Sequence, residues 1–233
     1  MSVRSALAVT LVLACVMLAG GAAAAPSEEK LLPLEQYTSE KARTLASTHG
    51  RALRELNTGI YHCIPWVEVQ KHSIGFFRPK HMTGDIRYLS LRIYIEQDPS
   101  GDFAQLRVEQ RASAMFSRYV GPLLKRMSKD AAVPADPALD GYTIILEWLK
   151  QAQRPAGDRP VHETIAIFID KPVARDYLAG TVPITEVAAK ARVLGFDGET
   201  ALGPLRLAVW DDNFVSTYKV ANYVLEPGVT CTS

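Results

Sequence analysis

The chain has 233 residues, with 26 Lys and Arg against 25 Asp and Glu, and 48% of its residues are hydrophobic. A chain of this length and apolar content can bury a core, and its mixed composition excludes a disordered, collagen-like or low-complexity protein. The balanced charge argues against a protein whose main ligand is nucleic-acid phosphate. We therefore expect a folded protein with no nucleic-acid partner.

The first 24 residues have the layout of a secretory signal peptide. Arg4 gives a short positive start, an unbroken small and apolar run spans residues 5–21, and alanines follow up to Ala25. Because proline directly after a cleavage site is poorly accepted, Pro26 favours cleavage after Ala24 over cleavage after Ala25. We expect residues 1–24 to be removed and the mature chain to be periplasmic or secreted.

Two alternatives apply to the same segment. The apolar run approaches the roughly 20 residues that a membrane span needs, so an uncleaved anchor is one. Lipid attachment at Cys15 is the other, because residues 12–15 loosely resemble a bacterial lipobox. The alanine-rich end and the acidic residues Glu28 and Glu29 favour cleavage, which leaves no transmembrane segment in the mature chain.

Two cysteines remain after removal of the signal peptide, Cys63 and Cys231. An even number of cysteines in an oxidising compartment indicates a disulfide. A catalytic or redox pair would favour a C-x-x-C spacing, which the sequence lacks. We predict a structural Cys63–Cys231 bridge between the first strand and the end of the chain, which stabilises the fold by up to about 5 kcal/mol because it closes so long a loop.

A polar lead-in at residues 25–37 precedes a single predicted domain at 38–233. Leu45, Leu53 and Leu56 lie on one helical stripe, and Gly59 supplies a stop signal. The alternation within residues 86–96 is typical of a strand with one solvent-exposed face. The elements predicted in this half are a helix at 38–57, strands at 60–70 and 86–96, and a helix at 102–127 that Gly121-Pro122 kinks or splits.

A connector at residues 128–141 leads into the second half of the chain. Pro172 begins and Gly180 ends a short helix, and Asp197-Gly198 is typical of a hairpin tip. The elements predicted here are strands at 142–149 and 163–169, helices at 172–180 and 184–191, a hairpin at 193–202, and strands at 205–210 and 214–225.

The order strand, loop, strand, helix occurs at residues 60–127 and again at 142–179. These two strand-loop-strand-helix units are either an internal duplication or two instances of a common arrangement. Both alternatives predict an α+β fold, with an antiparallel sheet and helices packed on one face.

Common catalytic and nucleotide-binding signatures are absent from the sequence. It contains no G-x-G-x-x-G, no P-loop, no G-x-S-x-G and no H-E-x-x-H. These motifs therefore supply no reason to predict an enzyme or a cofactor.

Four of the five histidines lie between positions 49 and 81. His62, His72 and His81 together with Asp85 are candidate ligands for zinc or copper, since imidazole and carboxylate groups are common ligands. Their spacing fits no familiar ligand pattern. His49 lies on the apolar stripe of the predicted helix, so we expect a hydrogen-bonded core residue there.

Residues 71–87 form the most distinctive predicted loop. They hold four Lys and Arg against one Asp, together with Phe76, Phe77 and Met82. Cations beside aromatic rings suit an anionic ligand, an acidic partner or a membrane headgroup region. We predict ligand or partner binding by Phe76, Phe77, Arg78 and Lys80. The alternative is a strand connection whose phenylalanines enter the core.

Other polar clusters have structural explanations. Asp211-Asp212-Asn213 and Asp197 with Glu199 coincide with predicted turns. His162 and Glu163 are adjacent in a strand and point to opposite faces, so they cannot easily act as one acid–base pair. We expect Trp66, Trp148 and Trp210 in the core.

These observations predict an exported protein of the bacterial envelope that acts as a non-enzymatic binding or assembly module. It would be a monomer or weak oligomer, without a cofactor, that meets its ligand or protein partner through the 71–87 loop and the exposed sheet face. The alternative is a secreted metal-dependent hydrolase built on His62, His72, His81 and Asp85.

Overall fold

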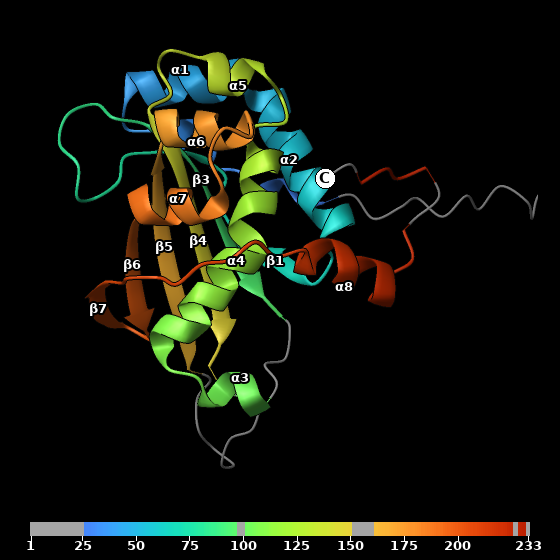
Figure 1. Ribbon diagram of the computed structural model, residues 1–233. Coiled ribbons are helices and arrows are strands. Elements are labelled where there is room, and N and C mark those ends of the chain that lie inside the picture. Colours follow the sequence, from blue (N-terminus) through green and yellow to red (C-terminus); the bar gives the residue numbers. More distant parts are fainter. Residues whose placement is uncertain (1–25, 97–100, 151–160, 226–227, 232–233) are drawn as a thin grey trace, which may run out of the picture.

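The computed structural model describes residues 26–96, 101–150, 161–225 and 228–231 (Figure 1). Its strands form one seven-stranded, mostly antiparallel sheet, and its helices pack on one face of that sheet. The α+β prediction is therefore confirmed. The predicted signal peptide and Cys15 lie outside the described residues.

The sheet has the strand order β1-β3-β4-β5-β6-β7, and β2 pairs with β3 beside β1. Among the described strands, β3 and β4 form a parallel pair and the other pairs are antiparallel. The parallel pair arises because the chain leaves the end of β3 and returns through a helix on the covered face, as parallel connections require. The strands are β1 (Val67–Val69), β2 (Gly75–Phe77), β3 (Tyr88–Ile95), β4 (Gly141–Leu149), β5 (His162–Asp170), β6 (Arg192–Asp197) and β7 (Thr200–Pro204).

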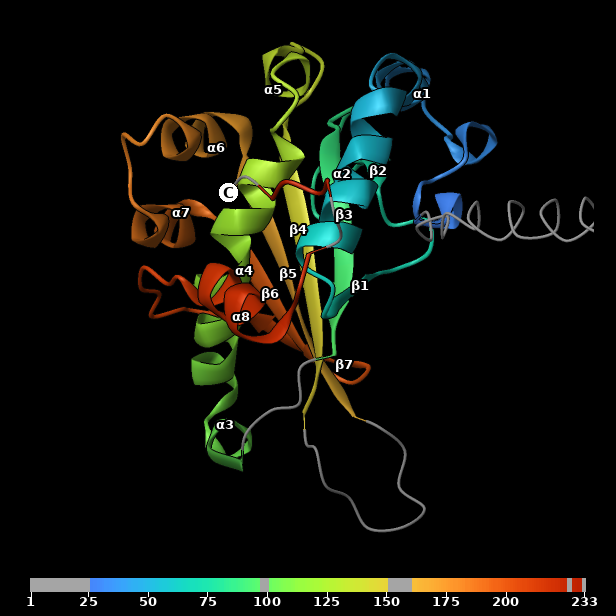
Figure 2. The same cartoon turned by 90° about the vertical axis from the view of Figure 1, so that its right-hand side faces the viewer.

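The helices pack against alternate residues of the strands. Tyr142, Ile144, Leu146 and Trp148 on β4 are each at most 1% exposed, as expected for side chains that face a helical layer. Figure 2 shows α4, α6, α7 and α8 on one side of the sheet. The helices are α1 (Glu40–Thr48), α2 (Gly50–Cys63), α3 (Gly101–Gln105), α4 (Val108–Met127), α5 (Ala132–Ala135), α6 (Lys171–Leu178), α7 (Ile184–Lys190) and α8 (Phe214–Asn222), with short 3-10 turns at Glu28–Lys30 and Leu34–Gln36.

The predicted boundary between the helix at 38–57 and the strand at 60–70 is wrong. Two helices, α1 and α2, occupy this region, and α2 continues to Cys63. Asn57 does not end the helix; its side chain donates a hydrogen bond to the Ser27 carbonyl. Leu56, Ile60 and Cys63 are buried at helical spacing, so the β-branched and aromatic residues after Gly59 serve one face of a helix.

The predicted helix at 102–127 is interrupted near Arg107, between α3 and α4, and not at Gly121-Pro122. Pro122 lies inside α4. At Gly121, α4 lies close to α6, because a Cβ atom there would clash with the Tyr177 hydroxyl unless that side chain moved. The glycine therefore marks a close contact between helices and not a helix end.

The last two predicted strands are absent. Residues 205–210 lie in neither a helix nor a strand, and α8 replaces the strand expected at 214–225. Asp212 Oδ1 accepts the Phe214 N–H and so supports the start of this helix. Phe214 and Tyr218 then stack with ring centroids 5.0 Å apart. The expected connector at 128–141 also contains a short helix, α5, whereas the hairpin around Asp197-Gly198 is confirmed by the β6–β7 pairing.

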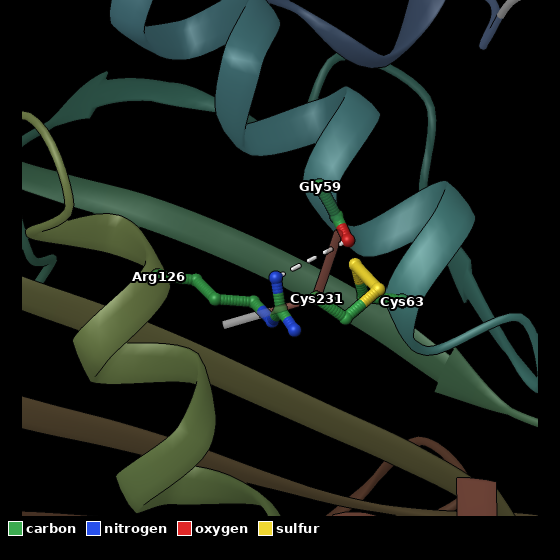
Figure 3. The surroundings of a disulfide bond; sticks show 4 residues. All are labelled: Gly59, Cys63, Arg126 and Cys231. Atoms are coloured by element: carbon green, nitrogen blue, oxygen red, sulfur yellow. Dashed lines mark hydrogen bonds between the residues drawn. A yellow bond between two sulfur atoms is a disulfide. The ribbon is translucent and has the colours of Figure 1, made fainter. Parts of the chain in front are cut away.

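The Cys63–Cys231 disulfide is present (Figure 3), with Cα atoms 5.6 Å apart across a sequence separation of 168. It connects the end of α2, and not the predicted first strand, to the C-terminal segment. Beside it, Trp66 contacts the rings of Tyr218 and Tyr223 at 4.9 and 5.3 Å. The bridge and these rings hold α8 and the segment after it against α2 and α4.

Candidate functional site: the open face of the sheet

The face of the sheet opposite the helices carries a second set of alternating side chains. Cross-strand registers place Tyr94, Glu147, Thr164 and Phe196 in one row, and Arg92, Ile145, Ala166 and Leu194 in the next. The large side chains of these rows remain partly exposed, unlike those of the helical face. The partly exposed apolar residues on this face are Tyr94, Ile145, Leu149, Phe168, Leu194 and Phe196. We refer to this set, with the charged residues between them, as the open face.

A carboxylate held between an arginine and a histidine lies within the open face. Glu147 Oε2 accepts hydrogen bonds from Arg92 Nη2 at 2.7 Å and Nε at 3.2 Å. Glu147 Oε1 lies 3.1 Å from His162 Nδ1, and the His162 ring contacts Tyr94 at 5.2 Å. The Glu147 side chain is 15% exposed, and its two partners fix its position from the two neighbouring strands, β3 and β5. This arrangement orients polar groups in a surface that is otherwise partly apolar.

The 71–87 loop contains strand β2, so its residues do not act as one exposed set. Phe76 is 2% exposed and packs in the core, where its ring lies 6.1 Å from that of His49. Phe76 was predicted to contact a ligand or partner, but its side chain is too deeply buried to do so. Phe77 points to the other side of β2 and is partly exposed. Arg78 and Lys80 are exposed, as the contact prediction requires.

The second half of the loop reaches the open face. The His81 ring meets the Phe168 ring of β5 edge to face, with centroids 4.6 Å apart. Partial burial and the nearby Arg192 lower the pKa of His81, so its imidazole is neutral at pH 7. Burial and a hydrogen bond to Asp170 raise the pKa of Tyr88, whose hydroxyl therefore stays protonated and donates to that carboxylate. The loop thus forms one rim of the open face.

The predicted metal ligands have separate environments. His62 lies in the last turn of α2 beside Tyr61, His72 has a positive φ of 54°, and His81 lies on Phe168. Asp85 accepts a hydrogen bond from Ser39 Oγ at 2.9 Å and pairs with Arg87. Within residues 26–96, 101–150, 161–225 and 228–231, no group of three or more His, Cys, Asp and Glu side chains could hold a metal ion.

Several other sequence interpretations are resolved. His49 is buried and lies 2.9 Å from Asp136 Oδ2, as predicted for a hydrogen-bonded core histidine. Trp66 and Trp148 are in the core, but Trp210 is 44% exposed and its prediction is wrong, because residues 205–210 form no strand. No described helix is both long enough and apolar enough to cross a bilayer.

His162 and Glu163 point to opposite faces, as the alternation predicted. Glu163 faces the helices and is 1% exposed. Its carboxylate accepts hydrogen bonds from Arg111 Nε at 2.7 Å and from Trp148 Nε1 at 3.1 Å. Sequence reasoning did not identify Arg111 as its partner, nor Arg92 and Glu147 as partners of each other. Strand alternation placed Arg92 on the exposed face. Only the β3–β4 register brings it within hydrogen-bonding distance of Glu147.

Comparison of the chain with protein-family models, with curated proteins and with solved structures gave no match.

Proposed function

We propose that this protein is an exported, non-enzymatic binding or assembly module of the bacterial envelope, and that it binds a protein partner through the open face and the exposed cations of the 71–87 loop. The observation that carries the proposal is the face of the sheet that no described helix covers, where Tyr94, Phe168 and Phe196 stay partly exposed between charged groups. Interfaces of this kind combine aromatic residues with a polar rim.

The exposed positive charge of the loop indicates what kind of partner fits this surface. Arg78 and Lys80 are exposed at the rim and make no ion pair among the described residues. Glu147, in contrast, is already held by Arg92 and His162. The free positive charge at the rim therefore favours a partner that presents an apolar patch with acidic residues beside it. The disulfide and the predicted signal peptide support an oxidising compartment for this encounter.

The test combines charge reversal with site-specific cross-linking in envelope fractions. Arg78→Glu/Lys80→Glu should lower affinity for the partner by at least about tenfold, because opposite charges at a rim become like charges. The control Arg51→Glu/Arg54→Glu changes the same number of exposed cations on α2 and should leave affinity within about twofold. Both variants should melt close to the unchanged protein, since all four side chains are exposed.

A photo-reactive residue at position 149 on the open face should trap one partner in stoichiometric yield, and the same residue at position 54 on α2 should not. The trapped protein is then purified and its affinity for the variants measured. Equal trapping from both positions, or equal binding by Arg78→Glu/Lys80→Glu and the control, would contradict the proposal.

A further inference from the structure

A second surface, on the helical side of the molecule, has a different chemistry. A hollow of about 510 Å³ lies between the end of α4, α6 and the start of α8. Four cationic side chains line it together with one carboxylate, that of Asp212. These cations are Lys125, Arg126, Lys129 and Lys219. We call this hollow the basic pocket.

The protein offsets only part of the positive charge of the basic pocket, because Asp212 is the one carboxylate beside four cations. None of its four cations forms an ion pair in the part of the chain that the structure describes. Asp212 is already engaged, because its two carboxylate oxygens accept the Trp210 indole N–H at 3.0 Å and the Phe214 backbone N–H at 2.7 Å. In a chain with a formal net charge of +1, this local concentration of unpaired charge is a distinct feature.

Arg126 gives the strongest indication that the pocket binds an anion. Its guanidinium extends from α4 towards the end of α2 beside the disulfide (Figure 3), where Nη1 makes a long hydrogen bond of 3.4 Å to the Gly59 carbonyl. Burial lowers the pKa of Arg126. Glu55 and Asp130 line a smaller neighbouring hollow, but Glu55 pairs with Arg51 and Asp130 accepts the Ala132 N–H. A partly buried guanidinium without a carboxylate partner is costly unless an anion reaches it.

We propose that the basic pocket binds a phosphate group carried by a small organic molecule. Phosphate matches the planar donor set of Arg126 and the point charges of Lys129 and Lys219. Pro122, Leu178 and Val215 form an apolar wall beside the cations, which suits the organic part of such a ligand. A volume of this size is within the range of small-molecule sites. The source of the phosphate is either a soluble phosphate ester or an anionic lipid headgroup.

The cations have one other explanation. Lys125 and Arg126 lie in the last turn of α4, and Lys219 in the last turn of α8, where positive side chains offset the helix dipole. If that were their whole role, removing them would lower stability and the pocket would bind no anion. Lys129 lies beyond the end of α4 and faces the same hollow, which the dipole explanation does not require.

The test is calorimetric titration with inorganic pyrophosphate at low ionic strength. The unchanged protein should bind it one to one, and Lys129→Gln/Lys219→Gln should bind at least about tenfold more weakly, because the variant lacks two ammonium groups that donate charge-assisted hydrogen bonds to phosphate oxygens. The matched control is Arg54→Gln/Arg206→Gln, which removes two exposed cations that lie outside the pocket and form no ion pair with any residue that the structure describes. Its affinity should stay within about twofold of the unchanged protein.

Co-sedimentation with vesicles separates the two sources. Binding to phosphatidylglycerol vesicles but not to phosphatidylcholine vesicles, lost in Lys129→Gln/Lys219→Gln, identifies a lipid headgroup. Pyrophosphate binding without vesicle binding identifies a soluble phosphate compound. Failure to bind either probe, equal loss of binding in the control, or a lowered melting temperature of Lys129→Gln/Lys219→Gln without anion binding would overturn the proposal. The open face takes no part in these measurements, so its own test stays independent.

Discussion

Arg111 and Glu163 form a buried ion pair that joins α4 to β5. The two side chains are 7% and 1% exposed, and Arg111 also donates to the carbonyls of Ala104 and Leu106. The guanidinium therefore connects the start of α4, the segment before it and the central sheet. A buried ion pair adds little to the free energy of unfolding compared with apolar residues in its place, but removing one partner alone lowers that free energy strongly. The pair therefore serves mainly to position α4 on the sheet.

We predict that Glu163→Ala lowers the free energy of unfolding by about 3–5 kcal/mol, since it leaves the Arg111 guanidinium buried without its carboxylate. The double variant Arg111→Met/Glu163→Leu should recover most of that loss. Urea denaturation of the unchanged protein and these two variants measures both effects. A Glu163→Ala loss below about 1 kcal/mol would show that the carboxylate does not stabilise the buried cation.

Asp136 provides a pH-dependent contribution to stability. Burial alone would raise the pKa of its carboxyl group, but hydrogen bonds from His49 and from the Ala138 N–H, with the charge of Lys171, lower it below the usual 3.8. A carboxyl group whose pKa is depressed by folding stabilises the native state above its unfolded pKa and loses that contribution as the pH falls through the folded value.

Asp136→Asn should therefore lower the free energy of unfolding by about 1–2 kcal/mol at pH 7, because a charge-assisted hydrogen bond becomes a neutral one. The difference from the unchanged protein should shrink as the pH falls below about 4. Urea titrations between pH 7 and pH 3 measure it. If Asp136→Asn lowers the free energy of unfolding equally at pH 7 and at pH 3, the ionised Asp136 carboxylate is not the cause of the loss.

At the scale of elements, the disulfide and the aromatic rings act on α8. This helix buries one residue of its own, Val215, so its position depends on its ends. The start is fixed by Asp212, and the far side by the contacts of Tyr218 and Tyr223 with Trp66. The Cys63–Cys231 bridge holds the chain beyond α8 to the end of α2.

Cys63→Ser/Cys231→Ser should lower the free energy of unfolding by up to about 5 kcal/mol, because the unfolded chain regains the freedom of a very long loop. Amide hydrogen exchange should rise first in α8 and the residues after it, while β3, β4 and β5 stay protected. Mass spectrometry of exchange in the variant and the unchanged protein checks both statements. Uniform loss of protection across the sheet and α8 would show that the bridge has no local role.

At the scale of the whole molecule, the prediction concerns export. If residues 1–24 are a cleaved signal, the protein recovered from the envelope or the medium begins at Ala25 and has no free thiol. Intact-mass analysis before and after alkylation under denaturing conditions measures the first residue and the thiol content together. A cytosolic protein that begins at Met1 and has free Cys63 and Cys231 thiols would contradict the predicted compartment, and with it the proposed envelope partner.

Sequence periodicity predicted the elements whose apolar residues recur on one face. Alternation in β3 predicted one covered face of apolar residues, and Asp197-Gly198 gave the β6–β7 hairpin, where Gly198 has a φ of 58°. The same reasoning failed at Ile60–Cys63 and in α8. Both segments are rich in β-branched or aromatic residues, whose intrinsic preference for strands is overridden by packing on one side of a helix.

The sites depended more on tertiary structure than the elements did. Arg78 and Lys80 were identified from the loop composition and are exposed, but Phe76, chosen by the same reasoning, is in the core. The basic pocket had no signal in the sequence, because Lys129 and Lys219 are far apart along the chain and meet only when α8 packs beside α4.

The order of residues alone was sufficient for the α+β class and the pairing of the two remaining cysteines, since both follow from side-chain alternation and from an even count of thiols. Tertiary structure decided the parallel β3–β4 pair, the partners of Glu147 and Glu163, and the convergence of four cations at the end of α4. Contacts between distant segments have no period in a sequence, because they arise from strand register and from how helices pack on the sheet.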